Sequence, residues 1–292
     1  MVTTLLDNAV DLRASLLDED TNALRLVDGM GDGVQGFALE NYAGKWMAMT
    51  PGGEIRADIK EWLKASGRSI YWKRLDQHHK ESPMHLYGEP VDGAFSIREN
   101  RLNFEVSFSS GYSQGIFLDQ RLNRAEVMQR MARGRKLLNL FSYTGAFSVA
   151  AAMAGAETTT LDLSSVYLEW AKRNFRFNGL DESEHFFCKG DAFHWLKRFA
   201  KQERIFDGIV LDPPTFSRDE NGKVFRVEKD FGELVELAKQ VLAKDGWMLC
   251  CTNFRGISER DFMRMINMPK MQGVKMPEDF SEDPYLKSVW VG

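Results

Sequence analysis

Three aspartates stand where strands of a predicted sheet end. Asp162, Asp191 and Asp212 each close an apolar or β-branched stretch of the length expected for a buried strand. In an open α/β sheet, ligands bind outside the carboxyl ends of the parallel strands. Carboxylates at that edge can accept hydrogen bonds from hydroxyl and amino groups, and they favour cations. The three residues therefore predict a binding edge for a small ligand rich in such groups.

The stretch from Lys136 to Ser164 narrows the class of ligand. Leu137–Phe141 is typical of a buried strand, Ser142–Gly145 of a turn, and Ala146–Ala154 of a helix that ends at a glycine. A dinucleotide-binding turn needs several glycines so that its backbone can approach a pyrophosphate, and this turn contains only one. An adenosine ligand without phosphates fits better, and S-adenosylmethionine is such a ligand. Taken alone, the stretch also suits any parallel α/β unit with an acid at a strand end.

Each aspartate has a candidate role toward S-adenosylmethionine. Asp162 would accept hydrogen bonds from both ribose hydroxyls. Asp191 would accept one from the adenine amino group, and it could equally be the N-cap of the next helix. Asp212 would accept from the ligand's ammonium group, and the rigid Pro213-Pro214 turn after it could hold a substrate base near the methyl donor. Three such acids in successive strands favour a methyltransferase over an ordinary sheet.

The elements around these residues predict two domains. Residues 1–110 are expected to form a small, β-rich α+β domain for substrate recognition, and residues 111–292 a Rossmann-like α/β domain with a seven-stranded sheet. A helix is predicted over Leu5–Leu17, and a final strand within Tyr285–Val291 would complete the sheet in antiparallel fashion. Ser217–Lys229 is charged and predicts a loop, either a plain surface loop or a mobile cover for the substrate.

The composition is that of an ordinary globular protein, with 292 residues, 43% hydrophobic and 27% charged. The formal net charge of −4 gives no overall attraction for nucleic acid, so RNA contact would need a local basic patch. Cys188, Cys250 and Cys251 lack metal-ligand spacing, which indicates a reducing compartment and no metal site. The sequence has no signal-peptide pattern and no apolar run long enough to span a bilayer. We therefore expect a cytoplasmic protein without a membrane partner.

Two groups of cations could contact RNA through charge and stacking. The first consists of Lys73 and Arg74, next to Tyr71 and Trp72, together with His78, His79 and Lys80. The two adjacent histidines would point apart on a strand, so we reject a metal site there. The second group belongs to the arginine-rich helix predicted at the start of the second domain, and a solvated surface is the alternative for both groups. The four candidates for RNA contact are Lys73, Arg74, Arg124 and Arg130.

Four motifs carry a resemblance to a known family. The second domain resembles class I S-adenosylmethionine-dependent methyltransferases, and more narrowly the bacterial large-subunit (23S) rRNA methyltransferases. The guanine-N7 member, the K/L-type enzyme, is matched by NLFSYTG at 139–145, YLEWA at 167–171 and LDPPTFS at 211–217, and the wider group by FLDQR at 117–121.

The resemblance implies S-adenosylmethionine as the cofactor and rRNA as the substrate, while the oligomeric state, monomer or homodimer, stays open. Arg121 opens a helix beside the ligand edge and could pair with a ligand carboxylate. The candidate cofactor-binding residues are Arg121, Asn139, Phe141, Ser142, Tyr143, Thr144, Gly145, Asp162, Leu163, Asp191, Ala192 and Asp212.

Two bases are candidate targets. Guanine N7 has a lone pair and can attack a sulfonium methyl directly, so positioning suffices. Cytosine C5 needs prior attack of a thiolate at C6, and Cys251 lies about where the I-type, cytosine-C5 relatives carry such a cysteine. Cys251 could also be strand packing. We favour guanine N7, with Asp212, Pro213 and Pro214 at the catalytic centre and Cys251 there only if the target is cytosine C5.

Three other functions stay open. The first is a class I methyltransferase that acts on a small molecule or a protein. The second is a non-catalytic RNA-binding module with a relict methyltransferase fold, against which the three intact aspartates argue. A nicotinamide dehydrogenase is the weakest, because the phosphate-binding glycines are missing.

Overall fold

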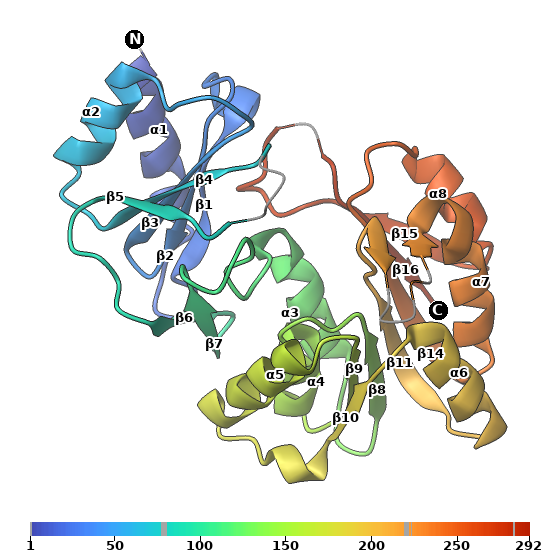
Figure 1. Cartoon of the computed structure of the whole chain (residues 1–292). Coiled ribbons are helices and arrows are strands. Elements are labelled where there is room, and N and C mark those ends of the chain that lie inside the picture. The colour runs from blue at the N-terminus through green and yellow to red at the C-terminus, as the bar shows by residue number, and fades with distance from the viewer. Residues whose placement is uncertain (1, 77–80, 219–221, 223, 283) are drawn as a thin grey trace. The chain divides into compact units, whose positions relative to one another are not determined.

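Two compact units make up the chain in a computed structural model, which describes residues 2–76, 81–218, 222, 224–282 and 284–292 (Figure 1). Unit 1 comprises Met1–Arg121 and Pro277–Pro284, and unit 2 comprises Leu122–Met276 and Tyr285–Gly292. The division falls after Arg121 and not at the predicted 110/111 boundary. A short segment near the carboxyl terminus also returns to unit 1, so neither unit is one continuous piece of chain.

Unit 1 contains a five-stranded sheet with helices packed on it. The strand order is β1-β2-β3-β4-β5, and only β3 and β4 run parallel. The helix predicted over Leu5–Leu17 is confirmed, although it spans Val2–Ala14, and a further helix spans Ala57–Ala65. The bounds are α1 (Val2–Ala14), β1 (Ala23–Asp28), β2 (Ala38–Tyr42), β3 (Lys45–Thr50), α2 (Ala57–Ala65), β4 (Ile70–Arg74), β5 (Met84–Tyr87), and the hairpin β6 (Ala94–Glu99) and β7 (Leu102–Ser107).

The segment Pro277–Pro284 is held in unit 1 by the fully buried Asp279. The two arms of the Arg121 guanidinium donate to its carboxylate oxygens at 2.7 and 3.2 Å, and the Arg25 N–H donates at 2.9 Å. Arg13 Nε donates to the Asp279 carbonyl at 3.2 Å. The guanidinium of Arg121 is therefore engaged by a protein carboxylate, and the predicted contact with a ligand carboxylate is wrong for this structure.

Removal of Arg121 is expected to destabilise the protein. Arg121→Ala leaves the Asp279 carboxylate buried without its charge partner, and breaking such a pair lowers the free energy of unfolding by about 3 kcal/mol. Urea unfolding measures this loss. The control is Arg101→Ala, which removes an exposed pair with Asp20 and should leave the free energy of unfolding almost unchanged. Equal losses in the two variants would contradict the role given to the buried pair.

Unit 2 is built on a seven-stranded sheet in the order β10-β9-β8-β11-β14-β16-β15. The first five strands are parallel, and β16 runs antiparallel to both β14 and β15. This confirms the predicted Rossmann-like sheet with an antiparallel final strand. The strand bounds are β8 (Lys136–Leu140), β9 (Glu157–Asp162), β10 (Phe186–Lys189), β11 (Phe206–Leu211), β14 (Leu242–Thr252), β15 (Met271–Val274) and β16 (Lys287–Val291).

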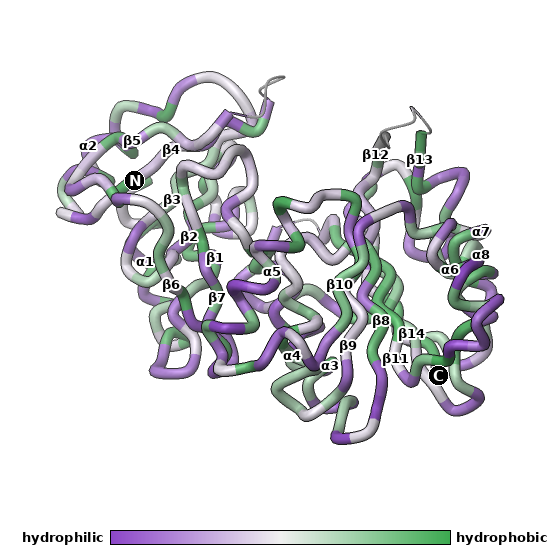
Figure 2. The backbone as a smooth tube through the Cα atoms, turned by 60° about the horizontal axis from the view of Figure 1, so that its bottom comes forward, coloured by the Kyte–Doolittle hydropathy of each residue, from purple (hydrophilic) through white to green (hydrophobic). Residues whose placement is uncertain are grey.

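Helices cover both faces of this sheet, with α4 and α5 on one face and α6, α7 and α8 on the other (Figure 1). The central strands are therefore buried on both sides, which explains their continuous apolar runs (Figure 2). In the part of the chain that the structure describes, no helix combines the length and apolar character needed to cross a bilayer. The helix bounds are α3 (Arg121–Arg130), α4 (Ala146–Met153), α5 (Ser165–Phe177), α6 (Ala192–Lys201), α7 (Val227–Lys239) and α8 (Glu259–Ile266).

The predicted loop over Ser217–Lys229 is instead mostly regular structure. β12 (Phe216–Arg218) and β13 (Val224–Arg226) form an antiparallel pair, and α7 begins at Val227. Phe225 explains the difference, because it is buried and its ring packs near the rings of Phe141 and Phe193. Phe225 thus joins this strand pair to the core of unit 2, and the buried Val227 at the start of α7 belongs to the same core.

Candidate active site

The carboxyl ends of the parallel strands form one edge, as predicted from the three aspartates. Leu211 pairs with Leu140, and Leu140 pairs with Leu161, which pairs with Cys188. The residues that follow these four positions therefore share one edge of the sheet. Asp162 and Asp212 follow two of them directly, and Asp191 comes shortly after the fourth.

The turn after β8 has an unusual backbone. Phe141, Tyr143 and Gly145 all have positive φ, at 57°, 49° and 75°. Such a conformation is uncommon for residues with a Cβ and costs about 1–3 kcal/mol each, so it tends to occur at functional sites. At Gly145 a Cβ would lie only 2.7 Å from Ala171 Cβ in α5, so the close approach of that helix also requires glycine.

Asp162 is oriented by the backbone around it. Its Oδ2 accepts the Tyr143 N–H at 2.9 Å, and its Oδ1 accepts the Ser164 N–H at 2.9 Å. Burial raises the pKa of the Asp162 carboxyl above its ordinary value, while these backbone donors act in the opposite direction. Each oxygen has a further acceptor position, so the carboxylate can also bind two ligand hydroxyl groups.

Asp191 takes its predicted role as the N-cap of α6, and its contact with the adenine amino group stays a prediction. Its Oδ1 accepts the His194 N–H at 3.0 Å and caps α6, and the residue also lines a pocket. The preceding Gly190 has φ 143°, and a Cβ there would lie 2.8 Å from Trp195 Nε1. That indole N–H donates to the Lys189 carbonyl at 3.0 Å, which holds the strand end and the helix start together.

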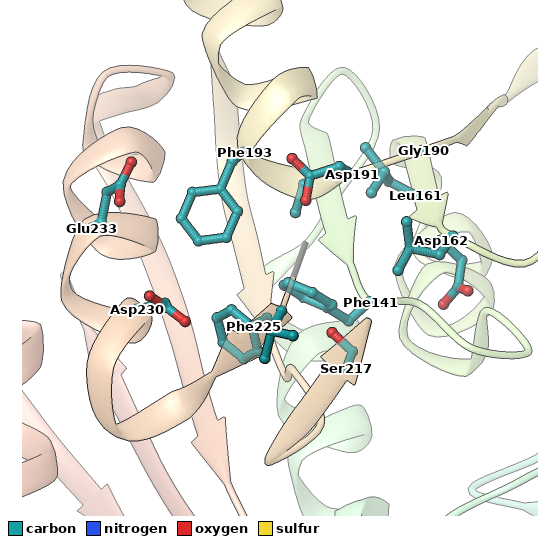
Figure 3. A pocket seen from close by; sticks show the side chains of 13 residues that line it. Phe141, Leu161, Asp162, Gly190, Asp191, Phe193, Ser217, Phe225, Asp230 and Glu233 are labelled. Atoms are coloured by element: carbon teal, nitrogen blue, oxygen red, sulfur yellow. The ribbon is translucent and has the colours of Figure 1, made fainter. Parts of the chain in front are cut away.

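The pocket encloses about 560 Å³, a volume that includes open solvent at its mouth. Asp162 lies toward one end and Glu233 toward the other, with Phe141, Phe193 and Phe225 between them (Figure 3). Aromatic walls with carboxylates at the ends suit a flat base joined to a hydroxyl-bearing sugar. The lining residues are Phe141, Leu161, Asp162, Leu163, Gly190, Asp191, Ala192, Phe193, Ser217, Val224, Phe225, Asp230 and Glu233.

A buried polar atom beside the pocket also fits a bound polar ligand. Ser142 Oγ has no hydrogen-bond partner among the described residues, and Ser142 follows the pocket residue Phe141. Buried hydroxyl groups are rarely left without a partner. This group and the carboxylate of Asp162 match an adenosine ligand without phosphates, which is the ligand class predicted from the sequence.

The pocket unites five of the predicted cofactor-binding residues, whereas the others take different positions. Asn139 is buried, and its Nδ2 donates to Ser148 Oγ of α4 at 3.0 Å. The Thr144 carbonyl accepts from Asn174 Nδ2 of α5 at 2.9 Å. These two hydrogen bonds hold β8 and the turn after it against α4 and α5. Tyr143 contributes its N–H to Asp162. The five residues that line the pocket are Phe141, Asp162, Leu163, Asp191 and Ala192.

The catalytic candidates lie on the same edge, outside this pocket. Asp212 follows β11 directly and is half-buried, Pro213 is buried, and Pro214 is exposed. The exposed proline shows that the end of this turn faces solvent, where an acceptor could approach. The turn therefore lies on the binding edge but is not part of the pocket wall.

Several residues that line the pocket were not predicted from the sequence. Phe193 directly follows the predicted site residue Ala192. That adjacency is the only feature of the sequence that could have identified Phe193 as a lining residue. Asp230 and Glu233 are spaced i, i+3 in α7, which places both on one helix face. That spacing could have identified them. Phe225 was not predicted, because it lies in a segment with many charged residues, Ser217–Lys229.

Two of the four RNA-contact candidates are wrong, because they are buried. Lys73 is 9% exposed, its Nζ donates to Gln114 Oε1 at 3.1 Å, and it lies 4.0 Å from the Tyr112 ring. Arg124 is 2% exposed and lies near the Phe147 ring. Neither side chain can reach a nucleic acid in this structure.

The other two candidates pair with acids. Arg74 forms two hydrogen bonds with Asp76, at 3.0 and 3.1 Å, and Arg130 donates to Glu126 at 2.7 Å. His78, His79 and Lys80 of the predicted basic cluster lie outside the described residues. Contact of Arg74 or Arg130 with RNA stays a prediction.

The burial of Lys73 predicts a stability that increases with pH. Burial lowers the Lys73 pKa from 10.5 to about 8, with opposing attraction from Glu40. Below pH 8 the lysine is charged in both states and its full burial cost is present. From pH 8 to 10.5 the unfolded state binds more protons, so the free energy of unfolding should rise by about 3 kcal/mol.

The test is the difference in unfolding free energy between wild type and Lys73→Met, measured by denaturant titration across that pH range. As the pH rises, the wild type should become steadily more stable relative to Lys73→Met. The same measurement on Lys201→Met, at an exposed position, should give a constant difference. A constant difference for Lys73→Met would contradict the burial argument.

Cys251 is fully buried, and its thiol donates to Ser288 Oγ on β16 at 3.6 Å. Cys250 is also fully buried, in the core of unit 2, and burial raises the pKa of its thiol. Among the described residues, no group of three or more His, Cys, Asp or Glu side chains is arranged to hold a metal ion.

Known proteins resemble this chain along most of its length. The model of a family described as S-adenosylmethionine-dependent methyltransferase matches residues 49–286. The candidate ribosomal RNA large subunit methyltransferase YwbD of Bacillus subtilis is 32% identical, over 97% of this chain and 78% of that protein. Ribosomal RNA large subunit methyltransferase K of Neisseria meningitidis is 35% identical, over 83% of this chain and 70% of that protein. A candidate methyltransferase solved in complex with S-adenosylhomocysteine (SAH) aligns with a TM-score of 0.89 at 30% identity, covering 99% and 80% of the two chains.

Proposed function

We propose that this chain, which belongs to the S-adenosylmethionine-dependent methyltransferase family, methylates a base of the large-subunit (23S) ribosomal RNA in the cytoplasm. The observation that carries the proposal is the backbone-oriented carboxylate of Asp162 at the rim of a pocket suited to a phosphate-free nucleoside. The names of the relatives from Bacillus subtilis and Neisseria meningitidis support RNA as the acceptor.

The chain's own residues divide the work of binding and positioning. Bound S-adenosylmethionine supplies a methyl group on a positively charged sulfur. Asp162 holds the ribose hydroxyls, Asp191 accepts from the adenine amino group, and Phe141 lies against the base. The turn at Asp212 and the prolines after it place the acceptor at the same edge of the sheet, where alignment of the reacting atoms lowers the barrier.

The burial of Cys251 favours guanine N7 over cytosine C5 as the target. Reaction at cytosine C5 needs a thiolate in contact with the base, and this thiol is buried and bonded to Ser288. Guanine N7 requires no such nucleophile. We therefore assign guanine N7 as the preferred atom within the proposed function.

Cys251→Ala is expected to keep the transferase active. The rate constant for methyl transfer should stay within about threefold of the wild type, because the thiol takes no part in attack on N7. Single-turnover transfer to rRNA measures it, with Cys250→Ala as the matched control for the loss of a neighbouring buried thiol. Loss of activity in Cys251→Ala alone, with a covalent RNA adduct in another Cys variant, would instead select cytosine C5.

The proposed function is tested by mapping methylation on rRNA. Large-subunit rRNA from a strain that lacks this protein should be missing one methylated base by mass spectrometry, and the purified protein should restore it in vitro. Incorporation of no label into that rRNA, by a protein that still binds SAH, would redirect the assignment to a small-molecule or protein acceptor.

A further inference from the structure

The β12–β13 hairpin has two faces with different surroundings. Cross-strand partners in an antiparallel pair share a face, and Ser217 is paired with Phe225, while Phe216 is paired with Arg226. Ser217 and Phe225 both line the pocket (Figure 3). Phe216 and Arg226 share the other face, and neither is among the residues that line the pocket.

The outer face presents an aromatic ring with a cation above it. Phe216 is 48% exposed, although neighbouring Phe225 is buried. The Arg226 guanidinium lies 5.4 Å from the centre of the Phe216 ring. Among the residues that the structure describes, no carboxylate forms an ion pair with this guanidinium, and Asp230 accepts only the Arg226 backbone N–H, at 2.7 Å. The pair thus has apolar surface and positive charge that the fold itself does not use.

We propose that Phe216 and Arg226 form the contact for an unpaired base of the RNA substrate, an inference that rests on the proposed function. The exposed ring would stack on a base, and the guanidinium would bind the adjoining phosphate. Unpaired bases in RNA are recognised by stacking on aromatic and Arg planes, and this contact tolerates any sequence because every base has a π-face. The chemistry of one ring and one cation matches that partner.

The position of the pair in the chain supports this use. Phe216 follows the turn of Asp212, Pro213 and Pro214, with one residue between. A base stacked on Phe216 would be held beside the turn that is proposed to receive the acceptor. The same short hairpin would close the nucleoside pocket with one face and hold RNA with the other.

A second phenylalanine and arginine in unit 2 provide a matched control. Phe186 on β10 is 47% exposed, and the Arg204 guanidinium lies 4.9 Å from its ring. Arg204 also donates to Thr159 Oγ1 at 3.2 Å, so its charge is held to the sheet. Neither residue lines the pocket. The two pairs match in chemistry and exposure but differ in their relation to the site.

The experiment compares Phe216→Ala with Phe186→Ala in the full chain. Affinity for a large-subunit rRNA fragment is measured by filter binding, SAH affinity by calorimetry, and folding by thermal unfolding. Phe216→Ala should weaken RNA binding about 5- to 150-fold, the range for loss of one stacked base. SAH affinity and the unfolding temperature should be unchanged. Phe186→Ala should bind RNA with the affinity of the wild type. Phe216→Trp, which keeps an aromatic ring at this position, should do the same.

A second variant tests the cation separately. Arg226→Gln should weaken RNA binding and reduce the dependence of the affinity on salt, because one phosphate contact is lost. Unchanged salt dependence would overturn the role of Arg226.

The outcomes separate this inference from the proposed function. If the wild type methylates the RNA but Phe216→Ala binds it equally well, the inference fails and the proposed function stands. An equal loss in Phe186→Ala would also overturn the inference, because the effect would then belong to exposed aromatics in general. Loss of SAH binding in Phe216→Ala would show that the ring supports the pocket instead. A wild type that binds SAH but neither binds nor methylates rRNA would overturn the proposed function itself.

Discussion

Asp212→Ala is expected to lower the rate constant for methyl transfer to rRNA by roughly 10³-fold, while the protein stays folded. The carboxylate stands at the end of β11, directly before a turn fixed by Pro213 and Pro214. Loss of the acceptor for the donor's ammonium group removes a charge-assisted hydrogen bond and lets the reacting atoms lose alignment, and a misplacement of about 1 Å alone can cost roughly 10²-fold. Single-turnover kinetics with saturating donor measures the loss.

The matched control for this variant lies on the same strand. Asp207 stands near the amino end of β11 and pairs with Arg135 at 2.6 Å, away from the binding edge. Asp207→Ala should leave the transfer rate within about twofold. Full activity of Asp212→Ala would contradict the role of Asp212, whatever the identity of the methylated base.

The edge of the sheet was predictable because its signals are local. A β-branched stretch before Asp162 and an apolar run before Asp212 mark strand ends, and parallel strands bring their carboxyl ends together by geometry. The turn at Gly145 was predictable for the same reason. The only information needed was the order of residues within short windows.

Contacts between distant parts of the chain could not be predicted in this way. Arg121 pairs with Asp279, at a separation of 158 residues, and no periodicity links the two positions. Lys73 looked like a surface cation because its aromatic neighbours suited RNA, yet it is buried against Gln114 and Tyr112. Phe225 looked like part of a charged loop. In each case the environment is set by tertiary packing, which a single sequence does not display.

Asp162→Ala is expected to weaken SAH binding by roughly 10³-fold. The carboxylate would accept hydrogen bonds from two ribose hydroxyls, and each hydrogen bond to a charged group contributes about 1.5–3 kcal/mol. The variant also removes the acceptor for the N–H groups of Tyr143 and Ser164, so the turn after β8 loses a restraint. Titration calorimetry with SAH measures the affinity. Asp162→Asn, which retains one acceptor oxygen, should show a smaller loss.

The ribose itself provides the sharpest check on this role. Wild type should bind SAH far more tightly than its 2′,3′-dideoxy form, and Asp162→Ala should bind both forms with nearly equal affinity, because the deleted hydroxyls and the deleted carboxylate belong to one interaction. Asp181→Ala is the control, since that exposed aspartate only caps a short 3₁₀ turn. If Asp162→Ala still discriminates between the two forms as strongly as the wild type, then the ribose lies elsewhere. The pocket at the edge of the sheet would then have to bind a different part of the donor.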